Sequence, residues 1–252
     1  RAGAPLSRLL FPAVLPLVAR WGPWGGTALA LSGVGVMVLI GQRMPLLLTV
    51  FGLFVTAVLL PRLRGTLLIA LLASALLMAT LSAISPPTFE RLVTKFSGQM
   101  QQLPESHYGQ IAARAVAIAR ANPLTGTGFD AFRRDCTNPA YFQGWDAGDG
   151  KGATICVQHP HNHYLQAVVE GGLPGLVLFS ALVVAWLRGV GRGLWRDPDP
   201  LRVGLFVAAL LHTWPIASAS NFSSMPLSGW FFVLLGLGLA ETRAYMTAKA
   251  QR

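Results

Sequence analysis

The stretch GTLLIALLASALLMATLSAI, residues 65–84, decides the fold class because it contains no charged side chain. As a helix it would span about 30 Å, since each residue adds roughly 1.5 Å, and this length matches the hydrocarbon core of a bilayer. Arg62 and Arg64 precede the stretch, and a polar region follows from Ser85. The sequence therefore predicts a transmembrane helix over residues 65–84.

Similar apolar runs recur along the chain. Two of them are separated only by a short turn at 41–43, and together they are too long for one crossing, so they predict a helical hairpin. A shorter run at 9–19 contains Pro12 and Pro16, which suits either the end of a truncated span or a kinked span. The hairpin arms and the remaining predicted spans are 24–40, 44–60, 173–187, 203–217 and 226–240.

Composition agrees with a membrane protein. Hydrophobic residues make up 53% of the chain and charged residues 12%, against roughly 25% charged residues in ordinary globular domains. The net charge of +10 would suit a nucleic-acid partner in a soluble protein, but these bases flank apolar runs, so we expect no nucleic acid. The chain begins with Arg1 rather than Met, and we expect further spans to precede it in a longer protein.

These patterns predict an all-α, polytopic transmembrane helical bundle surrounded by membrane lipids. Residues 1–84 would hold three to four spans, and residues 85–172 would form one large polar loop containing short helices. Residues 173–252 would add three spans and a tail. Within the loop, residues 105–121 predict an amphipathic helix that ends at Asn122-Pro123.

Basic residues in the short loops fix one orientation. Arg20, the pair Arg62 and Arg64, the cluster at 188–202 and the tail all fall on the same side when crossings are counted. An excess of bases marks the cytoplasmic side, so the polar loop and the 41–43 turn would face the periplasm from a bacterial inner membrane.

The predicted loop contains both cysteines of the chain, Cys136 and Cys156. The periplasm is oxidising, so the two residues are candidates for a disulfide bond. Two free, buried thiols are the alternative.

Three histidines, His159, His161 and His163, lie where the polar loop meets the next apolar run, at and just before the start of a short helix predicted at 161–170. Histidine suits general-base chemistry at neutral pH because its ordinary pKa is about 6.5. A zinc site is one alternative, and a helix cap is another. The nearest acids have no spacing that completes a metal site; they are Asp146, Asp149 and Glu170.

Two arginines are candidates for binding phosphate. Arg43 lies in the hairpin turn and Arg114 in the amphipathic helix, and the planar guanidinium group binds phosphate oxygens in pairs. Together they could hold a diphosphate without a metal. The alternatives are an interface anchor for Arg43 and a solvated helix face for Arg114. His212 lies inside an apolar run, and we attribute it to helix packing.

Three motifs together resemble the bacterial O-antigen ligase and polymerase superfamily over about residues 24–240. His161-Asn162 is followed after nine residues by Gly172-Leu173-Pro174-Gly175. NPLTGTGF at 122–129 resembles the Pro/Gly/Gly/Phe stretch of the family, and Gln42-Arg43 resembles its short arginine turn. Where members often carry an aromatic residue this chain has IAAR at 111–114, so Arg120 is the alternative to Arg114 as the second arginine.

The resemblance implies a GT-C-like membrane glycosyltransferase that needs neither a metal nor another cofactor and inverts the anomeric carbon. The donor would be a glycan on undecaprenyl diphosphate, the acceptor the lipid A-core oligosaccharide, and the product lipopolysaccharide. His161 would be the general base, and Arg43 and Arg114 would hold the diphosphate. Asn162 and His163 would add contacts to the substrate beside His161.

Other functions share part of this pattern. An O-antigen polymerase and a protein O-oligosaccharyltransferase use the same donor with other acceptors, and the modest outer loop favours the ligase. A transporter for the lipid-linked glycan would need several ionisable residues deep in its spans. A purely structural subunit would leave the histidines and arginines of the outer face without a role.

Overall fold

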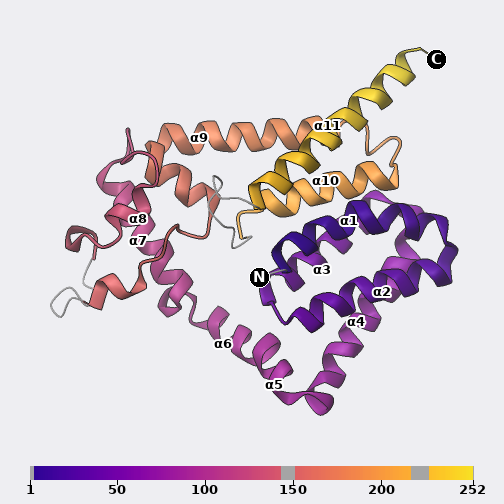
Figure 1. The fold of residues 1–252 in the computed structure, drawn as a ribbon, viewed down its shortest axis with the longest axis horizontal. Coiled ribbons are helices and arrows are strands. Elements are labelled where there is room, and N and C mark those ends of the chain that lie inside the picture. Colours follow the sequence, from indigo (N-terminus) through magenta and orange to yellow (C-terminus); the bar gives the residue numbers. More distant parts are fainter. Residues whose placement is uncertain (1–2, 143–150, 217–226, 252) are drawn as a thin grey trace. The chain divides into compact units, whose positions relative to one another are not determined.

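The computed structural model describes residues 3–142, 151–216 and 227–251 (Figure 1). Within these ranges the chain forms helices and turns and no strand. Residues 143–150, which include Asp146 and Asp149, and the ends of two predicted spans at 217 and 226 lie outside the described residues. The longer helices are α1 (Gly3–Arg20), α2 (Gly22–Ile40), α3 (Arg43–Leu59), α4 (Arg64–Ile84), α7 (His107–Ala121), α9 (His163–Gly191), α10 (Pro200–Thr213) and α11 (Leu227–Ala250).

Short helical segments connect the long ones. Beyond Ser85 the chain stays helical, so the polar region does not begin as an irregular loop. The short segments include α-helices, 3-10 helices and one π-helix, η2, among the described residues. They are η1 (Pro61–Leu63), α5 (Pro86–Phe89), η2 (Glu90–Thr94), α6 (Lys95–Gln101), η3 (Leu103–Glu105), α8 (Ala131–Asp135), η4 (Pro139–Tyr141) and η5 (Lys151–Ile155).

The apolar runs form helices close to where the sequence predicts them. The hairpin is confirmed: α2 ends at Ile40 and is capped by Gly41, which has a left-handed φ of 66°, and α3 begins at Arg43. The helix α11 continues past the predicted end at 240 to Ala250, because the added residues are mostly good helix formers.

The first helix differs from its prediction. α1 runs without a break through Pro12 and Pro16. Proline is tolerated in a packed helix where neighbouring segments compensate for the missing hydrogen bond. Here α10 approaches closely: a Cβ atom added to Gly204 would lie 2.7 Å from the Cα atom of Pro12.

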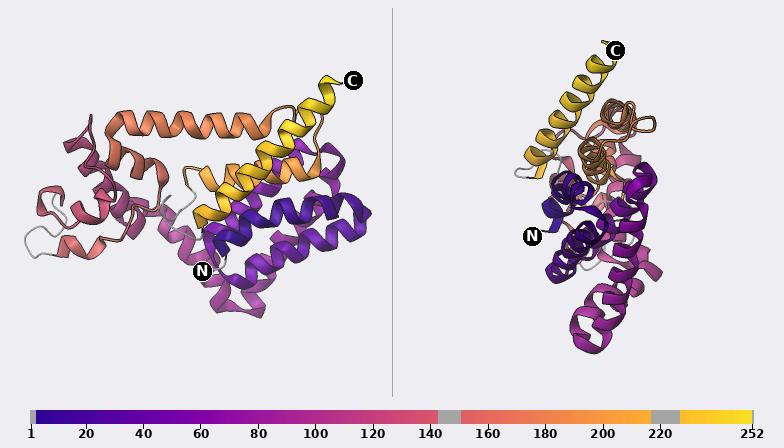
Figure 2. Two further views of the ribbon diagram at one scale, coloured as in Figure 1. Left: turned by 45° about the horizontal axis from the view of Figure 1, so that its top comes forward. Right: turned by 90° about the vertical axis from the view of Figure 1, so that its right-hand side faces the viewer.

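The chain divides into two compact units. One comprises Arg1–Ser97, Trp186–Trp214 and Met225–Arg252, and the other comprises Gly98–Ala185 and Pro215–Ser224. In the first unit α1 packs against α2, α3 and α10, and α10 packs against α11 (Figure 2). In the second unit α7 packs against α8, η4 and η5.

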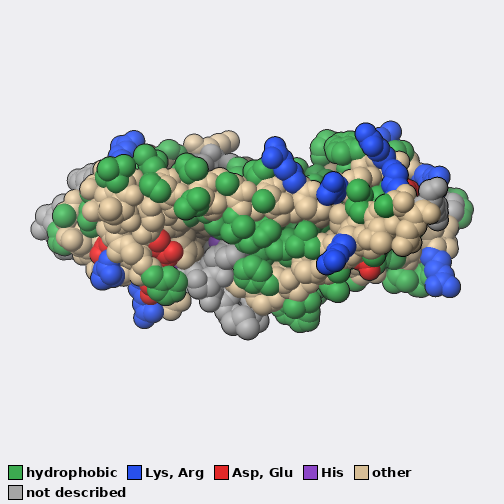
Figure 3. Space-filling view, turned by 90° about the horizontal axis from the view of Figure 1, so that it is seen from above, with side chains coloured by type: hydrophobic (Ala, Val, Ile, Leu, Met, Phe, Trp, Pro, Cys, Tyr) green, Lys and Arg blue, Asp and Glu red, His purple; other side chains and the backbone are tan. Residues whose placement is uncertain are grey.

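Within the described ranges, two segments are long and apolar enough to cross a membrane, Pro61–Ile84 and His163–Gly191. Shorter apolar helices cover Trp24–Ile40, Arg43–Leu59 and Pro200–Thr213. Leu72 and Leu178 are largely exposed, at 70% and 71%, and Figure 3 shows hydrophobic side chains spread over one face. Large exposed apolar surfaces are rare in soluble monomers, so these helices support a helical membrane protein.

We expect Gly204→Ala to destabilise the first unit. The added methyl group meets the α1 backbone, which has no flexible side chain to move away, and such overpacking costs about 1–3 kcal/mol. Gly236→Ala in α11 is the matched control, since its Cβ atom would meet nothing within 4 Å. Thermal unfolding in detergent should show a lower midpoint for Gly204→Ala alone; equal midpoints would contradict the close contact of α1 and α10.

Candidate functional site

His161 lies just before a helix and has an unusual backbone conformation. Its φ is 52°, a left-handed value that few residues other than glycine adopt. Asn162 caps the helix, because its Oδ1 atom accepts hydrogen bonds from the backbone N–H groups of Tyr164 at 2.8 Å and Leu165 at 3.0 Å. Its Nδ2 group donates to the Pro215 carbonyl at 2.5 Å. The helix therefore begins at His163, later than the predicted residue 161.

The helix that follows makes a sharp corner at Gly172. There φ is 64° and ψ is −161°, so α9 consists of a short segment from His163 to Gly171 and a long segment beyond the corner. The two segments approach each other closely, since a Cβ atom on Gly175 would lie 2.8 Å from the Ala167 carbonyl oxygen. Glycine is required at Gly172 because this backbone conformation is essentially closed to other residues.

The turn at 123–128 docks against this corner, and we call residues 123–128 with 169–173 the corner clamp. The N–H groups of Thr127 and Gly128 donate to the carbonyls of Val169 at 2.9 Å and Glu170 at 3.0 Å. The Leu173 N–H donates in return to the Pro123 carbonyl at 2.7 Å. The last carbonyls of a helix have no partner inside it, so the turn satisfies the end of the short segment.

Close backbone approach explains the glycine at 126. A Cβ atom there would lie 2.4 Å from the Glu170 carbonyl oxygen. Glu170 also reaches across the clamp, because its Oε1 atom accepts from the Asp130 N–H at 3.1 Å and from Gln166 Nε2 at 2.9 Å. The sequence analysis predicted the motifs at 122–129 and 172–175 separately, and the structure brings them together.

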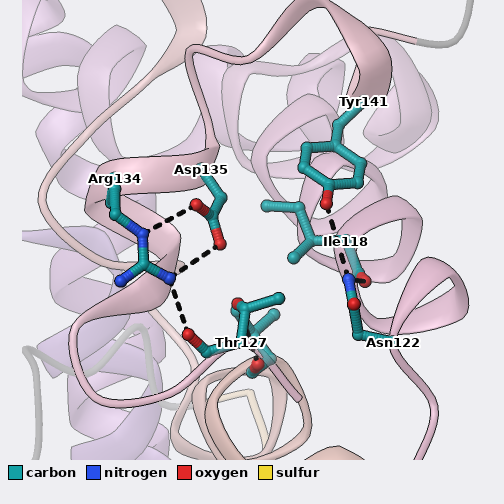
Figure 4. A network of polar contacts seen from close by, with 7 residues as sticks. Ile118, Asn122, Thr127, Arg134, Asp135 and Tyr141 are labelled. Atoms are coloured by element: carbon teal, nitrogen blue, oxygen red, sulfur yellow. Dashed lines mark hydrogen bonds and ion pairs between the residues drawn. The ribbon is translucent and has the colours of Figure 1, made fainter. Parts of the chain in front are cut away.

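The ion pair between Arg134 and Asp135 contacts the turn at 123–128 through the Thr127 carbonyl (Figure 4). Arg134 donates to the Thr127 carbonyl at 2.6 Å and to the Asp135 carboxylate at 2.9 Å. Burial acts to raise the pKa of Asp135, but hydrogen bonds from Arg134 and Thr127 and the charge of Arg134 outweigh it, so the pKa lies below its ordinary value. Tyr141 adds a hydroxyl 3.4 Å from Asn122 Nδ2, at the start of the turn.

The three histidines have different surroundings. The His161 ring lies edge-on to His159, with centroids 4.5 Å apart, and to Tyr108 of α7, at 5.7 Å. His163 is buried, with its ring centroid 6.3 Å from that of Phe179. Tyr108 was missed by the sequence analysis, since only the packing of α7 brings it beside His161. Among the described residues no group of three or more His, Cys, Asp or Glu side chains is placed to hold a metal ion.

Arg114 is fully buried, and the alternative of a solvated helix face is wrong. Its guanidinium group donates to the carbonyls of Cys136 and Gly152, and its Cζ atom lies 4.2 Å from the centroid of the Phe142 ring. Cys136 and Cys156 form a disulfide bond beside it. Burial lowers the pKa of Arg114. This arginine therefore ties the disulfide-bonded part of the loop to α7.

The other two arginines differ from Arg114. Arg120 is exposed near the end of α7, in the same unit as His161. Arg43 is partly exposed at the first position of α3, in the other unit. A common site for Arg43 and His161 stays a prediction.

Comparison with known proteins agrees with these motifs. A family model described as O-antigen ligase matches residues 27–180, a range that contains Arg43, α7, the turn at 123–128 and the corner at Gly172. The chain therefore belongs to the O-antigen ligase family, and the resemblance seen in the sequence is confirmed. Its apolar helices agree with a membrane enzyme of the ligase and polymerase type.

One curated protein is similar over a shorter range. It is the exopolysaccharide production protein ExoQ of Rhizobium meliloti (strain 1021), 32% identical over 105 residues. The match covers 39% of this chain and 22% of the relative, so the chain matches about a fifth of that protein. No solved structure matches the chain.

Alanine substitutions at the adjacent glycines Gly171 and Gly172 should have different effects on the corner clamp. In Gly172→Ala the added Cβ atom would lie 2.6 Å from the Pro123 carbonyl oxygen. The alanine would also have to adopt the backbone conformation of Gly172, which costs about 1–3 kcal/mol for a residue other than glycine. Gly171→Ala meets nothing within 4 Å. We expect Gly172→Ala to increase hydrogen exchange at Thr127 and Gly128, and Gly171→Ala to leave it unchanged; equal exchange in both variants would contradict the clamp.

Replacement of Arg114 should reduce stability. Arg114→Gln leaves the carbonyls of Cys136 and Gly152 without their donor, at about 1–3 kcal/mol for each buried group. Arg120→Gln removes an exposed charge and should leave the unfolding midpoint unchanged. If Arg114→Gln unfolds at the wild-type temperature, the assigned structural contacts of Arg114 are wrong.

Proposed function

We propose that the chain is part of an inverting, metal-independent glycosyltransferase at the periplasmic face of a bacterial inner membrane. The donor is a glycan on undecaprenyl diphosphate, and the acceptor is the lipid A-core oligosaccharide. The acceptor oxygen attacks the anomeric carbon, the bond from that carbon to the diphosphate oxygen breaks, and undecaprenyl diphosphate leaves. Family membership supports this reaction class.

The way in which His161 is held is the observation that carries the proposal. Its ring is partly exposed, and its backbone lies between the Pro160 segment and the cap formed by Asn162. A neutral imidazole in this position takes the proton from the acceptor hydroxyl as that oxygen attacks. His163 is buried beside Phe179, which favours packing over substrate contact.

Two cations hold the diphosphate and stabilise the charge that develops on the leaving oxygen. Arg43 is one of them. Arg114 was the first choice for the second, but its donors bind loop carbonyls, so the exposed Arg120 is the better candidate. In this account Arg114 positions the loop that carries the site.

A polymerase is the second candidate, favoured by the similarity to ExoQ, which is named for exopolysaccharide production. It uses the same donor, and the acceptor is the end sugar of another lipid-linked glycan. The same His161 chemistry applies, so the acceptor alone separates the two candidates.

Reconstitution of the full-length protein tests both. Lipid-linked glycan is mixed with lipid A-core, with a second repeat unit or with an acceptor protein, and the products are separated by mass. We expect transfer to lipid A-core, unaffected by excess chelator. His161→Ala should reduce the rate by about 10²–10⁴, the usual contribution of a general base.

The matched control is His107→Ala, an exposed histidine at the start of α7. It should transfer at the wild-type rate. Normal transfer by His161→Ala would overturn the general base, product from the repeat unit alone would favour the polymerase, and a reversible loss in chelator would favour a metal.

A further inference from the structure

Tyr108 in the first turn of α7 has no assigned role, although it lies beside the candidate general base. Its ring centroid is 5.7 Å from that of His161, and Tyr108 is 49% exposed. A tyrosine that only filled space against His161 would gain most from being covered, because burial of the large ring is what makes such packing favourable. The half-open ring of Tyr108 is therefore accessible to a ligand.

The place of Tyr108 follows from the buried stripe of α7. Ile111 and Ala115 are fully buried, and Tyr108 precedes them by three and seven residues, so it continues the same face toward the start of the helix. The stripe belongs to a core that includes Val169 of α9. The packing that buries the stripe thus also brings the first turn of α7 to the turn that precedes α9.

The rings of His107 and His161 meet the Tyr108 ring at steep angles. The angles between ring planes are 66° and 67°, so neither of these neighbours lies flat on Tyr108. A stacked ring covers a face of its neighbour, as His212 does on Phe231 at 16°. An edge contact covers less of a face, in agreement with the exposed fraction of Tyr108.

An open tyrosine ring is suited to a sugar. The C–H groups on one side of a pyranose ring form an apolar patch with a partial positive charge, which is attracted to the negative face of an aromatic ring. The phenol hydroxyl can donate to or accept from a sugar hydroxyl. A diphosphate is repelled by that negative face, so Tyr108 suits the glycan part of a substrate.

The neighbour of Tyr108 indicates which sugar this is. In the proposed reaction His161 takes the proton of the attacking hydroxyl, so the sugar that carries this hydroxyl lies against the His161 ring. The distance of 5.7 Å between the two centroids is about the width of one sugar ring. The same sugar can therefore lie on Tyr108.

We propose that Tyr108 is a binding residue for the acceptor, with its exposed ring stacked on the sugar whose hydroxyl attacks. This assignment rests on the proposed function, because the general base is what distinguishes the acceptor from the donor. Tyr108 makes the same contact before and during the attack, so it contributes to acceptor affinity rather than to the chemical step.

The first experiment measures binding without transfer. The full-length protein in detergent, with no donor, is titrated by calorimetry with the core oligosaccharide released from lipid A or with one free repeat unit of the glycan. We expect the wild type to bind one of the two. Tyr108→Ala should bind that oligosaccharide about tenfold more weakly, the loss expected for one buried aromatic contact.

Two further variants separate stacking from stability. Tyr108→Leu keeps apolar volume against His161 but has no aromatic face, so it should bind as weakly as Tyr108→Ala, even where the alanine variant fails to fold. Tyr108→Phe keeps the face and should bind within about threefold of the wild type, since only a hydroxyl is lost. As a control, Trp195→Ala removes another exposed aromatic ring, in the other unit, and should bind normally.

Transfer kinetics separate contact with the acceptor from positioning of His161. For Tyr108→Leu we expect the acceptor KM to rise about tenfold, with the donor KM and the kcat at saturating acceptor unchanged. A lower kcat and a displaced pH profile at an unchanged acceptor KM would show that Tyr108 only positions His161. A rise in the donor KM alone would place the donor on Tyr108. Either result overturns the proposal.

Failure of this site and failure of the proposed function give different results. If Tyr108→Leu binds like the wild type while His161→Ala loses transfer, the sugar contact is wrong and the general base stands. If Tyr108→Leu loses binding while His161→Ala transfers normally, the general base is wrong and the sugar contact stands. A wild type that binds neither oligosaccharide, a Tyr108→Phe variant as weak as Tyr108→Leu, or an equal loss in Trp195→Ala would overturn the contact.

Discussion

The helix that follows His161 is only a few turns long, and the carbonyls at its end need partners that the helix cannot provide. The turn at 123–128 provides them through its own backbone, which requires glycine at 126 and 172, where any side chain would collide with main-chain atoms. A contact made by backbone atoms has few ways to relax. The position of the helix that follows His161 therefore depends on two segments that are far apart in the sequence.

Two buried arginines contact backbone carbonyls and aromatic rings. Arg114 donates to loop carbonyls and lies against the Phe142 ring, and Arg202 donates to the Arg192 carbonyl and lies over the Tyr245 ring. A guanidinium group stays charged at any physiological pH, so its surroundings must adapt to the charge. In both cases carbonyl oxygens of the same compact unit accept hydrogen bonds from the guanidinium group.

The apolar runs, the hairpin and the stop of α7 at Asn122 were predictable because they depend on local composition and on residues that end helices. The corner at Gly172 was not, since its partner lies more than forty residues earlier and only the fold joins them. The burial of Arg114 was hidden for a similar reason: helical spacing placed it beside the apolar stripe, but the disulfide-bonded loop covers it. α1 is longer than the predicted run at 9–19, and α10 approaches it closely at Pro12.

The account depends on Arg43 and His161 opening on the same side of the membrane, where a lipid diphosphate can reach both. Single cysteines at Gln42 and Gln158, beside these two residues, test this by reaction with a membrane-impermeant maleimide in intact cells; Cys136 and Cys156 are paired and do not react. We expect both introduced cysteines to be labelled from the periplasm. Labelling of the residue-42 cysteine only after the inner membrane is opened would contradict the account.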